Sequence, residues 1–383
     1  MRTFMALGLL LAGLPASART LVVRPGQSIR AALARAGAGD RVEVFPGTYR
    51  EGGPQEASAL TITRNGIELA GLSSPGHPVV LENAGAQSYG VWVSPANSLP
   101  ARDDEHPPCG GPQPALVKGF RISGFTVRGF AVHGVHLACV DGFSIVDNRS
   151  ENNAVYGLFP VRSRHGLMAG NVVTGTTDDA AVYVGQSEDV LITGNEVFGN
   201  LLGIEIENSG NCAAVANDVH HNTAGILVDL LPELQRGTQE NALIAFNSVH
   251  DNNLTNKAEE GILAVVPAGV GILIVSGRST VVLANEVRDN SFTGIAVASF
   301  CLALALQPGN VLDCHALGID PDPKDDRIVG NRLKDNGHGD FRANPFFESI
   351  KGDLIWDGSG TGNCWSANIF TPTPASAQLP ACR

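Results

Sequence analysis

Three acidic side chains in the middle of the sequence have the type and spacing for chemistry. Glu205 and Glu207 lie in one short apolar segment, and Asp229 ends the next such segment, which begins at Gly225. If the two segments stack as neighbouring strands, the carboxyl groups of Glu207 and Asp229 come to about 5 Å apart, which is near the spacing in retaining glycosidases. Like charges at that distance raise the pKa of one carboxyl group, and two such carboxylates could equally hold Ca²⁺. We therefore predict that Glu205, Glu207 and Asp229 are catalytic, with a calcium site as the alternative.

The same face carries aromatic and polar side chains that suit ligand binding. In these segments the second residue after a small residue points outward, because successive side chains of a strand alternate between its two faces. Read segment by segment, the outward positions are Trp92, His136, Phe159, Tyr183, Glu205 and Leu227. Stacked aromatic rings suit the apolar faces of sugar rings. We predict ligand contacts from the aromatic positions and from the turn that follows them, namely Trp92, His136, Phe159, Arg162, Tyr183, Gln186 and Asn208. The alternative is that loops cover this face and the aromatic side chains are ordinary packing.

A repeat of 22 to 24 residues places these side chains on one face. It is marked by an asparagine that recurs as Asn148, Asn171, Asn195 and Asn217. Five positions after each comes a second polar residue, in the order Asn153, Thr176, Asn200 and Asn222. A period of about 20–25 residues with strands and no helical repeat indicates a β-solenoid, whose coils stack at about 4.8 Å. Asparagine tolerates left-handed backbone geometry and can bond its copy in the next coil, so we expect these columns to be structural rather than catalytic.

The repeat also sets the expected domain boundaries. Residues 1–18 have a basic start, an apolar run and the triplet Ala16-Ser17-Ala18, which fits a secretory signal peptide. Residues 19–50 form a cap in which Ser28 begins a helix over residues 29–36. The solenoid covers residues 19–340, and residues 341–383 form a C-terminal cap or tail. Insertions interrupt the coils at about 95–116, 230–241, 253–270 and 300–326. The first, second and fourth of these leave the coil at one corner and would wall a groove beside the candidate residues.

Charge and cysteine content narrow the partners and the compartment. The formal net charge of −12 and the pI of about 5.3 argue against nucleic acid or an anionic membrane as a partner. Beyond the signal peptide, no stretch is long and apolar enough to span a bilayer. The seven cysteines suit local pairing in an oxidising compartment, Cys301 with Cys314, Cys364 with Cys382 and Cys109 with Cys139, which leaves Cys212 as a buried thiol. Their spacing is not typical of zinc sites.

Two groups of motifs resemble known families. Pro25-Gly26-Gln27-Ser28-Ile29, Gly39-Asp40-Arg41-Val42 and Pro46-Gly47-Thr48-Tyr49 resemble the N-terminal cap of the right-handed parallel β-helix (pectin-lyase-like) superfamily. Residues 183–187, 203–209 and 225–232, within a likeness that spans roughly residues 120–300, resemble an exported bacterial family of parallel β-helix repeat proteins without an assigned activity. The chain departs from that family at Ala181, where the family often has glycine. The resemblance implies an all-β fold, a right-handed single-stranded parallel β-helix with a short N-terminal capping helix. It also implies a periplasmic or extracellular location and an exported cytochrome-c-like protein as a candidate partner.

Two functions follow from these observations. The first is an exported protein that binds, or also processes, a polysaccharide or oligosaccharide along the outward groove, in the manner of a lyase, hydrolase or epimerase. The second is a non-enzymatic periplasmic scaffold that docks a protein such as the cytochrome-c-like partner. Motifs of known β-helix enzymes are incomplete here: Asp178-Asp179 lies in a turn, and Asp320-Pro321-Asp322-Pro323 lacks the histidine expected of alginate epimerases. The sequence indicates no cofactor other than the alternative calcium ion.

Overall fold

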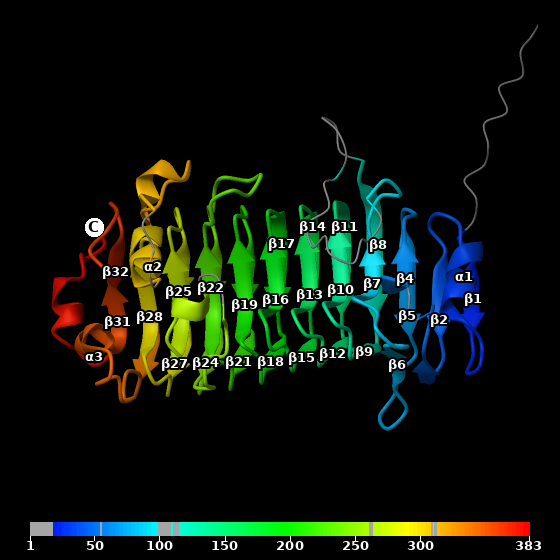
Figure 1. Ribbon diagram of the computed structural model, residues 1–383, viewed down its shortest axis with the longest axis horizontal. Coiled ribbons are helices and arrows are strands. Elements are labelled where there is room, and N and C mark those ends of the chain that lie inside the picture. Colours follow the sequence, from blue (N-terminus) through cyan, green and yellow to red (C-terminus); the bar gives the residue numbers. More distant parts are fainter. Residues whose placement is uncertain are drawn as a thin grey trace, which may run out of the picture.

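The chain winds into an elongated stack of coils in which three parallel sheets run side by side (Figure 1). The structure is a computed structural model that describes residues 18–53, 56–98, 109, 115–259, 263–307, 309 and 312–383. Nearly all of the expected signal peptide and most of the insertion at 95–116 lie outside the described residues. The pairing of successive coils is parallel throughout the three sheets, which confirms the predicted β-helix.

Each complete coil contributes one strand to each sheet, and the 12-stranded sheet has one additional strand at either end of the stack. The 12-stranded sheet 1 contains β1 (Thr20–Val23), β2 (Arg41–Val44), β5 (Ile67–Gly71), β8 (Val117–Ser123), β11 (Val140–Val146), β14 (Arg164–Ala169), β17 (Glu188–Thr193), β20 (Ala213–Val215), β23 (Leu243–Ala245), β26 (Val281–Leu283), β29 (Arg327–Val329) and β32 (Cys364–Ser366). The 10-stranded sheet 2 contains β4 (Ser58–Ile62), β7 (Tyr89–Val93), β10 (His133–Ala138), β13 (Tyr156–Val161), β16 (Ala180–Gly185), β19 (Leu202–Glu207), β22 (Ala224–Asp229), β25 (Val270–Val275), β28 (Thr293–Ala298) and β31 (Gly352–Trp356). The 10-stranded sheet 3 contains β3 (Gly47–Tyr49), β6 (Val79–Glu82), β9 (Phe125–Arg128), β12 (Arg149–Glu151), β15 (Val172–Thr174), β18 (Glu196–Phe198), β21 (Asp218–His220), β24 (Ser248–His250), β27 (Glu286–Arg288) and β30 (Arg332–Lys334).

Helices are short and lie at the ends or on the outside of the stack. They are α1 (Ile29–Arg35), α2 (Phe300–Leu306) and α3 (Pro345–Ile350), with 3-10 turns η1 (Leu263–Val265), η2 (Cys314–Ala316) and η3 (Ala375–Gln378). Figure 1 shows α1 over the first coil and α3 near the last. The Ser28 side chain accepts a hydrogen bond from the Ala31 amide, so the predicted N-cap is confirmed. None of the described helices is long and apolar enough to cross a bilayer.

Alternation along the strands separates an inner core from an outer layer. Val182 and Val184 of β16 face the interior of the coil and are fully buried there. Tyr183, between them, belongs to a second apolar cluster on the outer side of sheet 2. The same division holds in the neighbouring strands, so the predicted inward and outward positions are confirmed.

Two asparagine ladders run along the stack, as the repeat predicts. In most coils the ladder side-chain oxygen accepts bonds from the backbone N–H and the side-chain amide of the asparagine one coil earlier, as Asn217 does from Asn195. One part of the prediction is wrong, because the ladder asparagines are not in the left-handed region. That conformation belongs to the residue just before them, such as Ala216 (φ 56°) or His221 (φ 53°). The ladder asparagines are therefore buried hydrogen-bonding residues, and the left-handed turn of the chain lies at the residue before each of them.

The stack extends further than the fading repeat indicates. Strands β31 and β32 pair with β28 and β29, although they lie beyond the boundary expected at residue 340. Asn368 accepts the side-chain amide of Asn331 and so continues the first ladder. The segment that contains α3 separates these strands from the earlier coils and hides their period.

All three predicted disulfides are present, Cys109–Cys139, Cys301–Cys314 and Cys364–Cys382. Cys212 is the remaining cysteine and is buried in the inner core. Its sulfur lies 3.3 Å from the carbonyl oxygen of Gly210, and burial raises the pKa of the thiol to about 12.

We expect the native protein to resist thiol alkylation at pH 8. The reactive species is the thiolate, which is scarce at Cys212 because its pKa is raised and its sulfur is covered. Mass spectrometry after maleimide treatment should show no label on the folded protein and one label after denaturation without reductant. A label on the folded protein would contradict the burial of Cys212, and more than one label after denaturation would contradict the disulfides.

Candidate functional site

The outer face of sheet 2 is where the insertions gather. The segment after β22 occupies residues 230–242, and the segment after β28 contains α2 and η2. Both follow strands of sheet 2, and Figure 1 shows them at the same end of those strands. Phe300 and Leu304 of α2 pack into the outer apolar cluster. The Cys109–Cys139 disulfide ties the insertion after β7 to the end of β10.

Strand register places the predicted outward positions in one column. His136 pairs with Trp92 on one side and with Phe159 on the other. Glu205 pairs with Tyr183 and with Leu227. The rings of Phe159 and Tyr183 stack with centroids 4.5 Å apart, which joins the two halves of the column. The alignment read from the sequence is therefore confirmed, including its least regular position at Trp92.

This column is covered, which corrects the expectation of an open aromatic groove. Trp92, His136 and Phe159 have no exposed surface, and Tyr183 is 1% exposed. They form part of a ring layer in which Trp92 stacks on His136 at 3.9 Å and Tyr156 contacts Phe159 at 4.4 Å. The alternative in which this face is packed under loops describes these residues, so they do not offer a stacking surface to a sugar in this structure.

The three candidate carboxylates converge at the end of this column. Glu207 pairs directly with Asp229 in the next coil, and Glu205 lies two residues before Glu207 on β19. One carboxylate oxygen from each of the three residues lies within 4.8 Å of the others. Their exposed fractions are 5% for Glu205, 8% for Glu207 and 1% for Asp229. The structure thus brings together all three residues that were predicted to be catalytic.

Tyr183 reaches this cluster because Gly185 leaves room for its ring. The Tyr183 hydroxyl donates a 2.7 Å hydrogen bond to Oε1 of Glu207 in the next coil. A Cβ atom on Gly185 would lie 2.0 Å from the Tyr183 hydroxyl oxygen, closer than any real contact. Gly185 is therefore a positioning residue that sequence reasoning missed, since it occupies an ordinary strand position opposite Glu207.

Asp179 and Tyr156 complete the acidic end of the face. The Tyr156 hydroxyl donates a 2.7 Å hydrogen bond to Oδ2 of Asp179. Asp179 also acts on the pKa values of Glu205, Glu207 and Asp229. Sequence analysis assigned Asp179 to a turn. It did not predict Tyr156 as an outward residue, because the alternation of inward and outward side chains is broken at Gly157. The residue just before the small residue of each strand also lies on the outer side of sheet 2. His133 pairs with Tyr156 in the next coil, and Ala180 holds the same position on β16.

Burial and mutual repulsion favour the protonated forms of these acids. Burial raises the pKa of Glu207 to about 7, against the hydrogen bond from Tyr183, which lowers it. Burial first, and then Asp179, Asp229 and Glu207, raise the pKa of Glu205 well above its usual value. Burial and then Glu207 raise the pKa of Asp229 in the same way. The cluster can therefore hold and transfer protons near neutral pH, which is what acid–base catalysis requires.

Two of the predicted ligand-binding residues in the turn after sheet 2, Gln186 and Asn208, hold the segment of residues 230–242 by hydrogen bonds and do not face an open groove. The Asn208 amide donates to the carbonyl oxygens of Leu231 and Arg236, at 2.9 and 2.6 Å, and its oxygen accepts from the Leu231 amide. Gln186 accepts a bond from the backbone of Gln235. Arg162, one coil earlier, shares their left-handed backbone and is half-buried. The ligand contacts predicted for these residues remain predictions, and for Asn208 and Gln186 the structure shows a loop-holding role.

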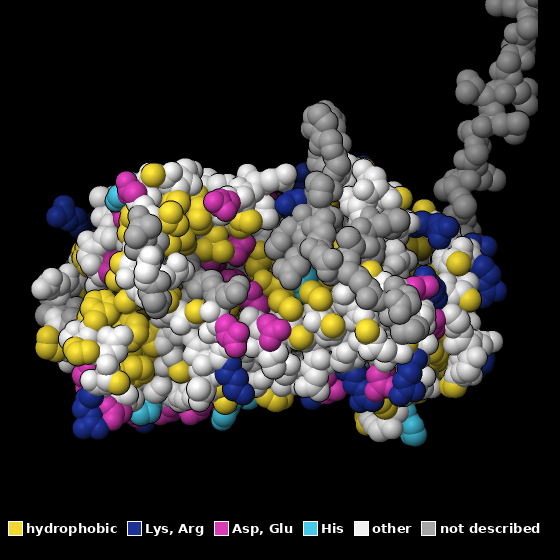
Figure 2. Space-filling view, in the orientation of Figure 1, with side chains coloured by type: hydrophobic (Ala, Val, Ile, Leu, Met, Phe, Trp, Pro, Cys, Tyr) yellow, Lys and Arg dark blue, Asp and Glu magenta, His cyan; other side chains and the backbone are white. Residues whose placement is uncertain are grey.

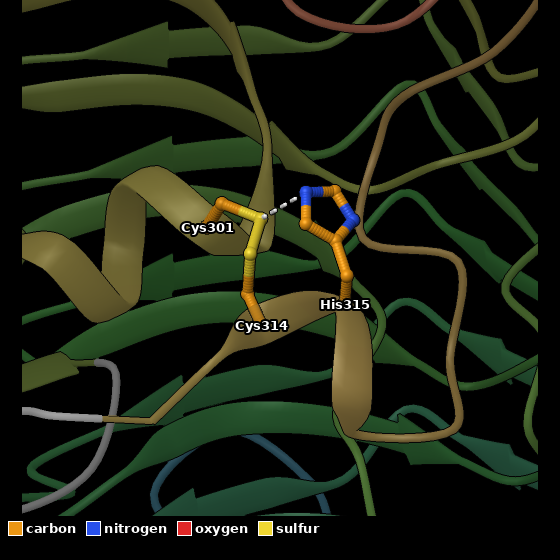
Figure 3. Close-up of side chains that lie close together, drawn as sticks. All are labelled: Cys301, Cys314 and His315. Carbon is orange, nitrogen blue, oxygen red and sulfur yellow. Dashed lines mark hydrogen bonds between the residues drawn. A yellow bond between two sulfur atoms is a disulfide. The ribbon is translucent and has the colours of Figure 1, made fainter.

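A second group of metal-type side chains lies on the insertion after β28. Figure 3 shows His315 beside the Cys301–Cys314 disulfide, with Nε2 of His315 3.8 Å from the Cys301 sulfur. Zinc sites use cysteine thiolates, and both sulfurs here are already bonded to each other. This group is therefore a staple between α2 and η2, consistent with the expectation that the cysteines bind no metal.

Comparison with known proteins agrees with this architecture. Residues 117–301 match the family model described as "Right handed beta helix region", a stretch that carries β8 to β28. The match covers just under half of the chain and agrees with the right-handed parallel β-helix fold of the structure. No curated protein sequence matches it.

Several solved structures superimpose on most of the chain. The periplasmic alginate epimerase AlgG has a TM-score of 0.56 at 16% identity, over 92% of this chain and 73% of that chain. A DFA-IIIase from Arthrobacter chlorophenolicus A6 has a TM-score of 0.53 at 12% identity, over 90% and 89%. The Geobacillus virus E2 protein ORF18 has a TM-score of 0.57 at 12% identity, and the match spans 57% of its length. At these identities the likeness shows the fold.

Proposed function

We propose that this β-helix is an exported protein that binds a polysaccharide or oligosaccharide at the acidic end of the outer face of sheet 2. The observation that carries the proposal is the convergence of Glu205, Glu207 and Asp229 within 4.8 Å, on the face where the insertions gather. Strongly shifted acids that converge beside loops are typical of functional sites. Figure 2 shows acidic side chains set between apolar ones in the middle of this face.

The carboxylates suit sugar hydroxyl groups as hydrogen-bond acceptors. Glu207 and Gln186 keep exposed fractions of 8% and 7%, so the ligand would meet the cluster at this edge while the aromatic layer stays packed behind it. The aromatic side chains that were predicted to contact the sugar would therefore pack behind the carboxyl groups and support the site. Three disulfides fit export to an oxidising compartment.

Processing of the bound sugar is the more specific form of the proposal. Glu207, with a pKa of about 7, can donate a proton near neutral pH, and Tyr183 orients its carboxyl group. The proton would pass to the glycosidic oxygen as its bond to the anomeric carbon breaks, while Glu205 or Asp229, in its ionised form, bonds to that carbon until water releases the sugar. AlgG and DFA-IIIase, by their names an alginate epimerase and a DFA-IIIase, share the fold and support a carbohydrate ligand. Epimerisation of alginate is not proposed, because the Asp320–Pro323 motif lacks the expected histidine.

The test is binding to an array of neutral, amino and uronic glycans by the wild type and by Glu207→Gln. We expect the wild type to bind one glycan class and Glu207→Gln to lose at least about tenfold in affinity, because the amide cannot act as a charged acceptor. Glu188→Gln is the matched control, since Glu188 is exposed on the adjacent sheet 1. Release of new reducing ends from the bound glycan distinguishes processing from binding.

Equal binding by the wild type and Glu207→Gln would contradict the site, and no binding to any glycan class would contradict the function. The second outcome would favour the scaffold that docks an exported cytochrome-c-like protein, which remains a prediction from family resemblance. Co-purification from the compartment would then test that partner directly.

A further inference from the structure

The carboxylates of Glu205, Glu207 and Asp229 are arranged for more than hydrogen bonding. All three side chains are at least nine-tenths buried, and an oxygen from each falls within 4.8 Å of the other two. Oε2 of Glu205 and Oδ1 of Asp229 have no hydrogen-bond partner among the described residues. Buried carboxylate oxygens without partners are costly, so these two atoms indicate a ligand that the protein atoms do not provide.

Within the part of the chain that the structure describes, no basic side chain is among the groups that shift the pKa of these carboxyl groups. The described groups that act on the three carboxyl groups are Asp179, Tyr183 and the carboxyl groups themselves. The Tyr183 hydroxyl satisfies a single oxygen of Glu207. A buried group of like charges is stable when it is neutralised by protons or by a bound cation.

We propose that Glu205, Glu207 and Asp229 form a calcium-binding site on the outer face of sheet 2. The donor set is entirely oxygen, which favours a hard cation over zinc or copper. A Ca²⁺ ion has Ca–O distances of about 2.3–2.6 Å, so it can contact oxygens up to about 5 Å apart. The smaller Mg²⁺ octahedron spans only about 4.2 Å. Oxygens that lie within 4.8 Å of one another are within reach of one Ca²⁺ ion, which tolerates the irregular geometry that Mg²⁺ resists.

The strands that carry the ligands explain how the site is positioned. Glu207 and Asp229 are paired residues on β19 and β22, and Glu205 is on β19 two residues away, on the same outward side. Side chains on paired strands of a rigid stack hold their spacing without help from a loop. The calcium site does not rest on the carbohydrate proposal. A carboxylate that holds Ca²⁺ is ionised, so the calcium-bound site would offer open coordination positions to sugar hydroxyl groups without the proton donation proposed for Glu207.

The experiment titrates the chelator-treated full-length protein with Ca²⁺ alone, by calorimetry. We expect saturable binding of one ion below about 1 mM, the range of extracellular calcium sites. Glu205→Gln and Asp229→Asn should each weaken binding at least about tenfold, while the exposed control Glu188→Gln should bind like the wild type. Mg²⁺ at the same concentration should compete poorly.

Terbium luminescence locates the ion even if a carboxylate variant fails to fold. Excitation of tyrosine should sensitise Tb³⁺ bound beside Tyr183, calcium should displace it, and Tyr183→Phe should reduce the emission per bound ion. Absence of calcium binding by the wild type would overturn the proposal, as would binding that both carboxylate variants retain, or equal competition by Mg²⁺. Calcium binding without any glycan binding would refute the proposed function and support this site. Glycan binding without calcium binding would support the proposed function and refute this site.

Discussion

Replacing Asn222 by alanine is expected to lower the free energy of unfolding by about 4 kcal/mol, because it leaves two buried donors without partners. The Asn222 oxygen accepts from the backbone N–H and the side-chain amide of Asn200, at 3.0 and 2.9 Å. Its own amide donates to the Val197 carbonyl oxygen and to the Asn252 oxygen. Asn222 has no exposed surface, so water cannot replace these bonds without opening the stack.

The measurement is urea denaturation followed by circular dichroism. Asn97→Ala is the control, because Asn97 is exposed on a turn after β7 and should change stability by less than about 0.5 kcal/mol. A repeat stack can unfold in parts, so the midpoint and the slope should both be compared. Equal midpoints for the two variants would show that the ladder contributes little, and the structural role of the asparagine columns would have to be abandoned.

The asparagine ladders also explain why so much of the fold could be predicted from the sequence. Each coil must pair its turn with the next coil, and the asparagine amide does so at a fixed position, as in Asn195 and Asn217. The small residue that starts each strand of sheet 2 has a similar cause. A Cβ atom at Gly203 would lie 2.5 Å from the carbonyl oxygen of Gly225 in the next coil. Constraints that recur in every coil leave a period that can be read without a structure.

The residues of the candidate site could be predicted only where their positions follow the repeat of the coils. The column through Tyr183 and Glu205 comes from strand alternation and was found. The burial of that column depends on insertions, whose path carries no repeat, and so the open groove was wrong. Gly185 was missed because it matters only through the ring of Tyr183, a side-chain contact that no spacing reports.

A third ladder went unnoticed because its members differ in type. At the corner after sheet 2, the N–H of Ser163 donates to the Ser187 hydroxyl, and the N–H of Ser187 donates to the Ser209 hydroxyl. Further along, the same kind of bond joins the Thr280 N–H to Asp326 at 2.7 Å. Serine and aspartate serve equally as acceptors here, so the chemistry repeats although the letters do not.

Asp326 is the weak point of this third ladder, and replacing it by asparagine should stabilise the protein at alkaline pH. Burial raises the pKa of Asp326 to about 8, against the bond from the Thr280 backbone, which lowers it. Asparagine keeps the side-chain oxygen that accepts from Thr280 and carries no charge. The next coil already uses an asparagine for this purpose, since Asn363 accepts from the Asp326 N–H at 3.0 Å.

The sign of the pH dependence follows from the direction of the shift. Because the folded state holds the Asp326 proton more tightly than the unfolded state, the protein is most stable below the unfolded pKa of about 4 and loses stability as the pH rises to about 8. At about 1.4 kcal/mol per pKa unit, the loss has an upper bound on the order of 5 kcal/mol. Asp326→Asn removes this dependence, so the melting temperatures of variant and wild type should diverge steadily between pH 4 and pH 8. Asp335→Asn, the same change at an exposed turn position that does not act on Asp326, should keep a constant difference from the wild type. If both variants track the wild type across this range, then Asp326 ionises in the folded protein without penalty, and the ladder must hold a charged acceptor as readily as a neutral one.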